Sequence, residues 1–346
     1  GWWAWGPGQF INFGIAVDMA FTNGRKRPEA PGKGAGQQLS VQTGDPRTFK
    51  TYEEFENAVK AHVAEQMRLT YLSAQYCVEA YKSYPLIIQS VMAHSGLERG
   101  LPFHEGGAWS SAYPGYVGEG IPDIGNSLAA VKKLVYDDKV ITMDQLCDAL
   151  DANFEGYEDI RQLCLNAPKY GNDDDYVDRI EQQIFNWIAE ETKSRPGILA
   201  KYDPDQGTAR IRHQPGMALV PLSGCVPYGK NVGALPSGRK LSEPLGDSCS
   251  AYYGTDVNGP TAAMKSVGKV NWAAQHGSIT NMYITRDVLQ DPAGRKRVND
   301  LIRGAFDAGV GQLQFNIMDK DILEDAQKHP DNYPSLIVRV TGYSAY

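Results

Sequence analysis

Amphipathic helix patterns that alternate with short strand-like runs restrict this chain to folds that mix helices and strands. A capping box begins at Thr51, and apolar residues follow at four-residue steps from Phe55 to Met67. Residues 175–188 also carry apolar side chains on one helical face, and residues 313–317 alternate apolar and polar side chains as a strand does. Because both element types are mixed along the whole chain without a repeated unit, the sequence predicts an α/β fold.

A Gly-rich passage from Gly96 to Gly125 interrupts these patterns. We interpret it as a long loop, followed by a helix over residues 127–135. Loops of this length are uncommon in compact domains unless they serve a function. The passage is therefore expected to be functional.

Composition limits the partners of the chain. The formal net charge is −7 and no long Lys/Arg run is present, which argues against nucleic acid or an anionic membrane as the main partner. No apolar stretch reaches the roughly 18 residues that a membrane span needs, and the first residues lack the basic segment and cleavage site of a signal peptide. We therefore expect a cytoplasmic protein that binds small molecules and other proteins.

The residues that could bind metal or react as nucleophiles form no recognised site. The five cysteines include no CxxC pair and no HExxH motif is present, so no metal site is expected. Asp173, Asp174 and Asp175 are interpreted as charges at the positive end of a helix dipole rather than as metal ligands. Cys77 lies two residues from a glutamate, but positions i and i+2 of a helix point apart. We interpret Cys77 as a buried core cysteine.

Several segments occur in an order that is typical of one enzyme family. They are SLAAVKKLVYDD at 127–138, NFEGYEDIRQLCLNAPKYGNDDDYVD at 153–178, GALPSGRKLSEPLGD at 233–247, GTDVNGPTAAMKSVGKV at 254–270, and LQFNIMD at 313–319 leading to LIVRVTGYSAY at 336–346. Together they resemble the C-terminal portion of the glycyl radical enzymes. This family includes pyruvate formate-lyase, the glycerol and choline lyases, and the fumarate-adding benzylsuccinate and alkylsuccinate synthases.

The resemblance implies a fold and a division into two parts. The family fold is a ten-stranded α/β barrel of two five-stranded halves with surrounding helices. Residues 1–225 would form the second half of this barrel, and residues 226–346 a truncated C-terminal glycyl radical domain. In the family, the cysteine that becomes a thiyl radical precedes a segment similar to the one that starts at Gly8. We therefore expect this chain to be a fragment whose catalytic cysteine lies upstream of Gly1.

The resemblance also implies the radical site. In the family, the glycine of an R-V-x-G-Y segment stores an unpaired electron on its α-carbon, and here that residue is Gly342. Glycine suits this role because it has no side chain and its loop can approach other backbone closely. Arg339, Val340, Thr341 and Tyr343 would support the loop, although the family more often has a smaller residue than Thr341. A radical S-adenosylmethionine activase would install the radical, and no bound cofactor is expected.

The opening segment suggests which reaction to expect. Trp2, Trp3 and Trp5 suit either an apolar wall of a substrate pocket or the ordinary hydrophobic core, and the segment resembles that of the benzylsuccinate and alkylsuccinate synthases. We therefore expect a carbon radical of toluene or an alkane to add to fumarate and give a substituted succinate. The residues that bind these substrates are not identified. A homo-oligomer, and small accessory subunits, are expected as further partners beside the activase.

Two alternatives remain open. One is a glycyl radical lyase, dehydratase, decarboxylase or formate acetyltransferase-like enzyme that acts on a polar substrate. The other is a non-catalytic subunit that only carries the radical. The long barrel-like sequence before the radical segment argues against the second alternative.

Overall fold

The computed structural model combines helices with short strands, and the predicted α/β class is confirmed. It describes residues 9–31, 34–92, 96–102, 116–194, 217–219, 224–275, 277–317, 319–334, 336, 338–340 and 343–345. The α-helices within these ranges are α1 (Phe13–Phe21), α2 (Tyr52–Ser83), α3 (Ile87–Met92), α4 (Gly96–Arg99), α5 (Ile121–Val131), α6 (Met143–Asp151), α7 (Glu158–Asn166), α8 (Asp175–Ser194), α9 (Cys225–Gly229), α10 (Gly259–Lys269), α11 (Asp287–Gln290), α12 (Pro292–Asp307) and α13 (Lys320–Lys328). The strands are β1 (Gln9–Asn12), β2 (Tyr116–Glu119), β3 (Met217–Leu219), β4 (Gly277–Ser278), β5 (Thr280–Ile284), β6 (Leu313–Ile317), β7 (Val338–Val340) and β8 (Tyr343–Ala345).

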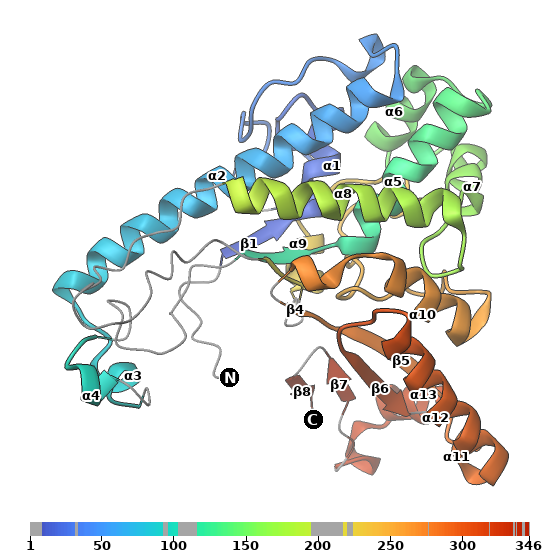
Figure 1. Cartoon of the computed structure of the whole chain (residues 1–346). Helices are drawn as coiled ribbons and strands as arrows, with labels where there is room; N and C mark the ends of the chain where they lie inside the picture. The colour runs from blue at the N-terminus through green and yellow to red at the C-terminus, as the bar shows by residue number, and fades with distance from the viewer. Residues whose placement is uncertain are drawn as a thin grey trace.

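A parallel sheet in the order β1-β2-β3-β4 lies at the centre of the described structure. β1 leads into α1 and β2 leads into α5, as expected for parallel strands joined by helical crossovers. The register pairs Asn12 at the end of β1 with Glu119 at the end of β2. Figure 1 shows α1, α5 and α8 near this sheet, and α1 and α8 each pack on α5.

The two faces of the sheet have different neighbours. Ile11, Met217 and Leu219 face the hydrophobic core that includes α1 and α5, and all three are fully buried. Gly118 faces the same way, because a Cβ on it would lie 2.7 Å from the Phe13 ring and 2.8 Å from Leu219. Since side chains alternate along a strand, Glu119 points to the opposite face.

Helix α2 begins as the sequence predicts. The Thr51 hydroxyl and the Glu54 side chain form the capping box, and the apolar residues from Phe55 to Met67 at four-residue steps are fully buried. Beyond them α2 extends away from the central sheet (Figure 1), and Cys77 is half-buried. The prediction of a buried Cys77 is therefore wrong, since this part of α2 lies away from the core around the central sheet. No helix in the described part of the chain combines the length and apolar composition needed to cross a membrane.

The Gly-rich passage was interpreted as a loop over too long a range. Helix α5 begins at Ile121, well before the predicted start at residue 127. Gly120 stands at its N-cap with φ +76°, a conformation that glycine adopts without strain. Gly125 lies inside this helix. A larger residue does not fit at this position, because a Cβ there would overlap the carboxylate of Glu181 on α8. This glycine therefore permits close helix packing and does not mark a loop. Residues 103–115 of the passage lie outside the described residues.

The C-terminal part carries two separate strand pairs. β5 and β6 pair in parallel with α11 and α12 between them in the chain, and the predicted strand at residues 313–317 is confirmed. β7 pairs antiparallel with β8, with Val340 beside Tyr343. Thr341 and Gly342, which separate these strands in sequence, lie outside the described residues.

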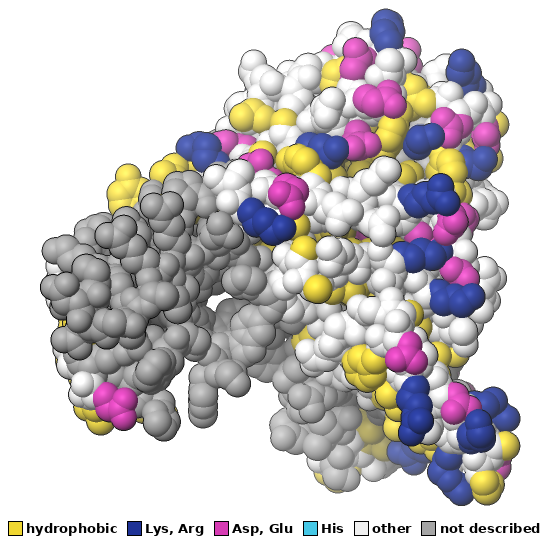
Figure 2. Space-filling model, in the orientation of Figure 1, with side chains coloured by type: hydrophobic (Ala, Val, Ile, Leu, Met, Phe, Trp, Pro, Cys, Tyr) yellow, Lys and Arg dark blue, Asp and Glu magenta, His cyan; other side chains and the backbone are white. Residues whose placement is uncertain are grey.

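Charged side chains of both signs are interspersed over much of the face shown in Figure 2. Lys and Arg gather at its lower right, in the region of α12. Arg295, Lys296 and Arg297 lie in the first turns of that helix. Lys296 pairs with Asp300 one turn later, and the Arg295 side chain donates to the carbonyl oxygens at the end of α11. Arg295 and Lys296 thus have local partners in the fold.

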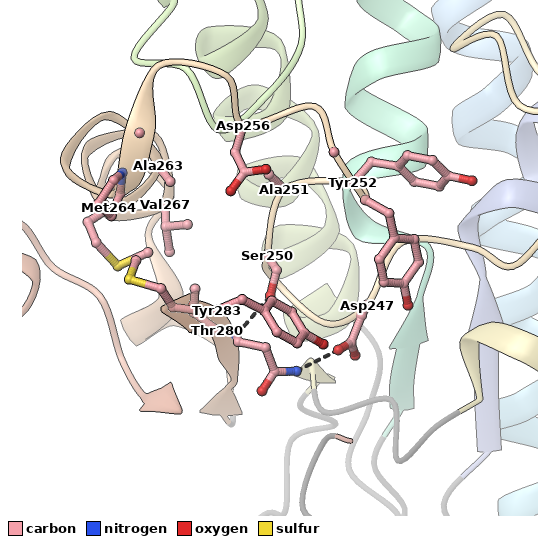
Figure 3. A pocket seen from close by; sticks show the side chains of 16 residues that line it. Asp247, Ser250, Ala251, Tyr252, Asp256, Ala263, Met264, Val267, Thr280 and Tyr283 are labelled. Carbon is pink, nitrogen blue, oxygen red and sulfur yellow. Dashed lines mark hydrogen bonds between the residues drawn. The ribbon is translucent and has the colours of Figure 1, made fainter. Parts of the chain in front are cut away.

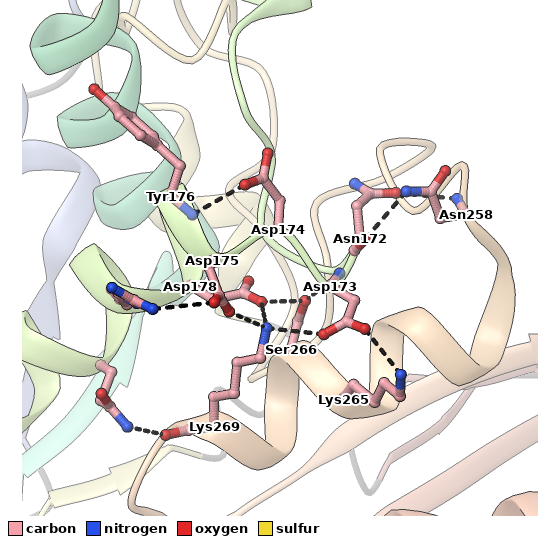
Figure 4. A network of polar contacts seen from close by, with 12 residues as sticks. Asn172, Asp173, Asp174, Asp175, Tyr176, Asp178, Asn258, Lys265, Ser266 and Lys269 are labelled. Atoms are coloured by element: carbon pink, nitrogen blue, oxygen red, sulfur yellow. Dashed lines mark hydrogen bonds and ion pairs between the residues drawn. The ribbon is translucent and has the colours of Figure 1, made fainter. Parts of the chain in front are cut away.

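A network of ion pairs joins α8 to α10 (Figure 4). Lys269 Nζ lies 2.8 Å from Asp173, 2.9 Å from Asp175 and 2.7 Å from Asp178. Asp178 is fully buried and also accepts a hydrogen bond from the Ser266 hydroxyl at 2.9 Å. Burial raises the pKa of Asp178, while Lys269 and Ser266 oppose that shift. The aspartates at the start of α8 therefore hold α10 in place.

Replacing Lys269 with methionine is expected to destabilise the protein by about 2–3 kcal/mol, because a buried carboxylate loses its cation. Lys265→Met is the matched control. Lys265 pairs only with Asp173 at the surface, so its loss should change the unfolding free energy by less than about 0.5 kcal/mol. Equal effects of the two variants in urea denaturation would contradict this account.

The loss of unfolding free energy in Lys269→Met should depend on pH in a defined direction. Lys269 lowers the pKa of Asp173 and of Asp175 and opposes the raised pKa of Asp178. Because the native pKa values of Asp173 and Asp175 are lowered, these groups stay ionised below the pKa of an unfolded aspartate, and the contribution of the lysine through them is lost only as the pH falls toward their native values. The difference between variant and parent should therefore be fully present near pH 7 and shrink below about pH 4, toward about pH 2. Urea denaturation at these pH values measures it.

Candidate functional site

The carboxyl ends of β1 and β2 bring polar side chains to the face of the sheet opposite α1. Helix α9 covers part of this face. The ring of Phe10 packs on Tyr228 with centroids 5.0 Å apart, and Asn12 Nδ2 donates to the Tyr228 carbonyl at 3.3 Å. Ligands of parallel α/β sheets bind at the carboxyl ends of the strands. This end of the sheet is therefore the candidate site.

Glu119, the last residue of β2, is a buried carboxyl group. It is fully excluded from solvent, and neither side-chain oxygen has a hydrogen-bond partner among the described residues. Burial, and then the nearby carboxylate of Asp247, raise the pKa of Glu119 to about 9. Glu119 is therefore protonated near pH 7, so it carries no charge and can donate a hydrogen bond.

Asp247 lies in the segment before α10 and is held by two side chains. Asn281 of β5 donates to Asp247 Oδ2 at 2.5 Å, and the Ser248 hydroxyl donates to Oδ1 at 3.1 Å. The Ser250 hydroxyl accepts the Asn281 backbone N–H at 2.8 Å and so ties the same segment to β5. Burial raises the pKa of Asp247, and the hydrogen bonds from Asn281 and Ser248 oppose this. The carboxyl group is thus fixed in one orientation.

Cys225 stands at the first position of α9, close to both carboxyl groups. Its Sγ lies 3.7 Å from the hydroxyl of Tyr253. Burial raises the pKa of Cys225 to about 11, and Asp247 and Glu119 act in the same direction. The group is therefore a neutral thiol near pH 7 and not a reactive thiolate.

A pocket of about 280 Å³ opens beside Asp247 (Figure 3). The segment from Asp247 to Asp256, helix α10 and strand β5 line it. Thr280 and Asn281 of β5 belong to the lining, although Thr280 Oγ1 and Asn281 Oδ1, which have no hydrogen-bond partner among the described residues, are closed off from solvent. Met264 and Val267 of α10 supply an apolar wall. The pocket therefore combines polar residues with a surface for a carbon skeleton.

Sequence reasoning did not find these pocket residues. Glu119 sits between two glycines at the end of a strand, which is a weak signal for a functional carboxylate there. Asp247 ends one of the segments on which the family resemblance rests, but nothing local marks it as a site residue. Thr280 and Asn281 read as ordinary strand residues. Among the described residues, no group of three or more His, Cys, Asp or Glu is arranged to hold a metal ion.

The residues predicted for the radical loop are described only in part. Arg339 and Val340 belong to β7, and Tyr343 begins β8. Thr341 and Gly342 lie outside the described residues, as do Trp2, Trp3 and Trp5. The structure therefore does not test the predicted role of these residues.

Two family models match the chain, one over its N-terminal part and one over its C-terminal part. Residues 2–212 match the model of the Pyruvate formate lyase-like family, and residues 245–346 match the Glycine radical model. Isethionate sulfite-lyase of Bilophila wadsworthia is 36% identical over 344 residues, which cover 98% of this chain and 39% of that protein. Trans-4-hydroxy-L-proline dehydratase of Clostridioides difficile is 37% identical over 312 residues, covering 89% and 38%.

The fold has close counterparts among solved structures. The glycerol-bound, B12-independent glycerol dehydratase from Clostridium butyricum superposes with a TM-score of 0.86 at 33% identity, over 97% of this chain and 40% of that one. Hydroxyproline dehydratase from Clostridioides difficile with its substrate bound gives a TM-score of 0.85 at 34% identity, over 97% and 41%. The chain thus spans about 40% of the length of the relatives that it matches.

Proposed function

Because this chain belongs to the pyruvate formate-lyase-like glycyl radical enzymes, we propose that it is part of a radical lyase that eliminates a leaving group from a small polar substrate. The observation that carries the proposal is the pocket at Asp247, whose lining combines polar residues, Thr280 and Asn281 among them, with an apolar wall. The activities of the relatives named above, a sulfite-lyase and dehydratases, favour the same class of reaction.

The predicted addition of a hydrocarbon to fumarate is not supported. The relatives named above act on isethionate, hydroxyproline and glycerol, and none is a fumarate-adding synthase. A hydrocarbon would make no hydrogen bonds with the polar residues that line the pocket. The tryptophans on which that prediction rested lie outside the described residues. We therefore adopt the lyase or dehydratase alternative.

The proposed reaction runs through two protein radicals. An activating enzyme removes a hydrogen atom from the α-carbon of Gly342, and the glycyl radical takes a hydrogen atom from a cysteine thiol that we place outside this chain. The thiyl radical takes a hydrogen atom from a substrate carbon that bears a hydroxyl. The neighbouring carbon then loses its leaving group while that hydroxyl releases a proton and becomes a carbonyl. The product radical finally recovers a hydrogen atom from the thiol.

Other features of the enzyme remain proposals. Arg339, Val340, Thr341 and Tyr343 are proposed to support the loop at Gly342, and residues 226–346 to form the radical domain after the barrel residues 1–225. No bound cofactor is required by this chemistry. A homo-oligomer and a cytoplasmic location are proposed on the composition described above.

A substrate panel tests the reaction class. The full-length enzyme that contains this chain, activated without oxygen by its activase, is expected to convert glycerol, propane-1,2-diol or isethionate to an elimination product, detected by mass spectrometry. Formation of a substituted succinate from toluene and fumarate, with no polar substrate consumed, would overturn the proposal. A stable glycyl radical with no turnover of any compound would instead favour the non-catalytic radical-carrying subunit.

A further inference from the structure

Large apolar side chains gather at the far end of helix α2. We define the apolar surface as the exposed large side chains of this end of α2, of α3 and α4 and of the turn between α2 and α3, namely Leu69, Tyr76, Tyr84, Ile87, Ile88, Val91, Met92 and Leu97. We propose that the apolar surface is covered, in the full-length enzyme, by the part of the same polypeptide that precedes this chain. The inference concerns assembly of the enzyme and does not depend on the reaction proposed above.

Helix α2 carries two apolar faces. The first, with apolar residues at four-residue steps from Phe55 to Met67, is fully buried in the core. Leu69 follows Met67 by two positions, and side chains two apart on a helix point away from each other. Tyr76 comes seven residues after Leu69 and shares its side of the helix. Leu69 is 46% exposed and Tyr76 is 76% exposed, so this second face lies in water within the described structure.

Helix α3 also presents an apolar face to water. Ile87 and Val91 are four residues apart, as are Ile88 and Met92, so the members of each pair are neighbours on the helix surface. Each of these four residues is between 51% and 76% exposed. Helices normally turn such a face toward a core, and soluble proteins rarely leave large contiguous apolar patches in water. The apolar face of α3 therefore requires a partner that this chain does not supply.

The segment that contains α3 has the composition of a protein interior. Residues 83–97 include no Asp, Glu, Lys or Arg. Charged residues are depleted from the core of permanent interfaces, whereas an interface that forms and dissociates is about as polar as the rest of the protein surface. The composition therefore fits a surface that is permanently covered. It fits less well the docking site of a partner that binds and leaves, such as the activase.

The enzyme has enough further polypeptide to cover the apolar surface. This chain spans about 40% of the length of the relatives that it matches, so most of a comparable enzyme lies outside it. A segment of the same polypeptide is present at a high effective concentration, on the order of millimolar for a short flexible connection. It can therefore cover the apolar surface as the protein folds, without a separate binding partner.

Strand β1 joins that polypeptide to the fold on the side of the apolar surface. Helix α2 lies along β1, because Gln66 Nε2 donates to the Asn12 carbonyl at 3.0 Å and Gln66 Oε1 accepts the Asn12 backbone N–H at 2.9 Å. Beyond Gln66, α2 projects on the side where β1 begins, and α3 and α4 lie at its far end (Figure 1). The polypeptide that precedes β1 is thus tethered at Gln9, on the side toward which the apolar surface projects.

Photo-cross-linking of the purified full-length enzyme tests the contact directly. p-Benzoylphenylalanine replaces Met92, which is 76% exposed in this chain, and the irradiated protein is separated by denaturing electrophoresis and digested for mass spectrometry. We expect an adduct within one polypeptide that joins position 92 to residues preceding Gly1. An adduct that doubles the mass of the polypeptide would assign the apolar surface to a second copy of the enzyme. The absence of any adduct would show that the surface faces water, and either result overturns the inference.

Limited proteolysis of the full-length enzyme gives a second readout. Chymotrypsin can cut after the tyrosine, leucine and methionine residues of the segment 83–97. Ile88→Glu places a charge in the proposed contact and is expected to speed this cleavage at least about tenfold, since burying an unpaired charge is costly and cleavage follows the population of the open form. Val140→Glu is the matched control. Val140 is 53% exposed and lies outside the apolar surface, so its replacement should change the cleavage rate by less than about twofold.

The two measurements check each other. Equal cleavage rates of Ile88→Glu and Val140→Glu would show that Ile88 is not covered, and would overturn the inference. If Ile88→Glu does not fold, the cross-linking experiment still decides, because it keeps Ile88. Neither measurement needs the activase, the radical or turnover, so failure of this inference is separate from failure of the proposed function.

Discussion

Gly342→Ala is expected to abolish both the protein radical and turnover. An α-carbon radical is stabilised when the carbon flattens between two amide groups, and the absence of a side chain allows this without a clash. The strands on either side of this residue, β7 and β8, pair with each other up to Val340 and Tyr343. Electron paramagnetic resonance of the activated full-length enzyme should show a doublet in the parent and no signal in the variant.

Gly304→Ala is the control for this experiment. Gly304 lies in α12, within the region that matches the Glycine radical model, and no atom lies within 4 Å of the position that its Cβ would occupy. Alanine is favoured over glycine inside a helix by about 1 kcal/mol. This variant should therefore keep the doublet and be at least as stable as the parent. An undiminished doublet in Gly342→Ala would show that the radical resides elsewhere.

Arg239→Met is expected to destabilise the protein by several kcal/mol, because each buried carbonyl that loses its hydrogen-bond donor costs about 1–3 kcal/mol. Arg239 is 3% exposed, and its guanidinium donates to backbone carbonyl oxygens within the segment that precedes the pocket. These carbonyls belong to Gly229, Val232, Gly233, Glu243 and Pro244. Methionine fills a similar volume but leaves the carbonyls unsatisfied. Urea denaturation measures the loss.

Lys240→Met provides the matched control for Arg239→Met. Lys240 is the next residue and is only half-buried, so its replacement should change stability by less than about 0.5 kcal/mol. Arg239→Lys tests the guanidinium itself. Lysine keeps the charge, but a single ammonium group cannot reach five carbonyls, so a loss between those of the other two variants is expected. Similar stability of Arg239→Met and Lys240→Met would contradict this account.

The loss of unfolding free energy in Arg239→Met, relative to the parent, should also depend on pH. Burial raises the pKa of Asp123 to about 6, and the charge of Arg239 opposes this shift. Without Arg239 the pKa of Asp123 rises further, which destabilises the fold above the pKa of an unfolded aspartate, where the unfolded state has lost its proton. The deficit relative to the parent should thus be larger at pH 8 than at pH 5. An opposite trend would exclude Asp123 as the group responsible.

The helices could be predicted from the sequence where the signal is local. The capping box at Thr51 involves residues three apart in the chain, and the burial of Phe55 to Met67 follows from helical periodicity. The same reasoning failed at Gly125 and Cys77, since each depends on a contact with a distant element. Glu181 on α8 requires the glycine in α5, and α2 leaves the body of the protein before Cys77.

The sequence by itself determined the family, the α/β class and the proposed radical residue, because ordered local segments such as the one around Gly342 carry that information without any contact. Only the tertiary structure decided the pocket. Asp247 precedes α10, whereas Thr280 and Asn281 belong to β5, and no spacing in the chain links them. They meet because Asn281 binds both Asp247 and Ser250 as β5 pairs with β6. Hydrogen bonds between segments about 30 residues apart are set by the packing of the strands, and a linear pattern does not record them.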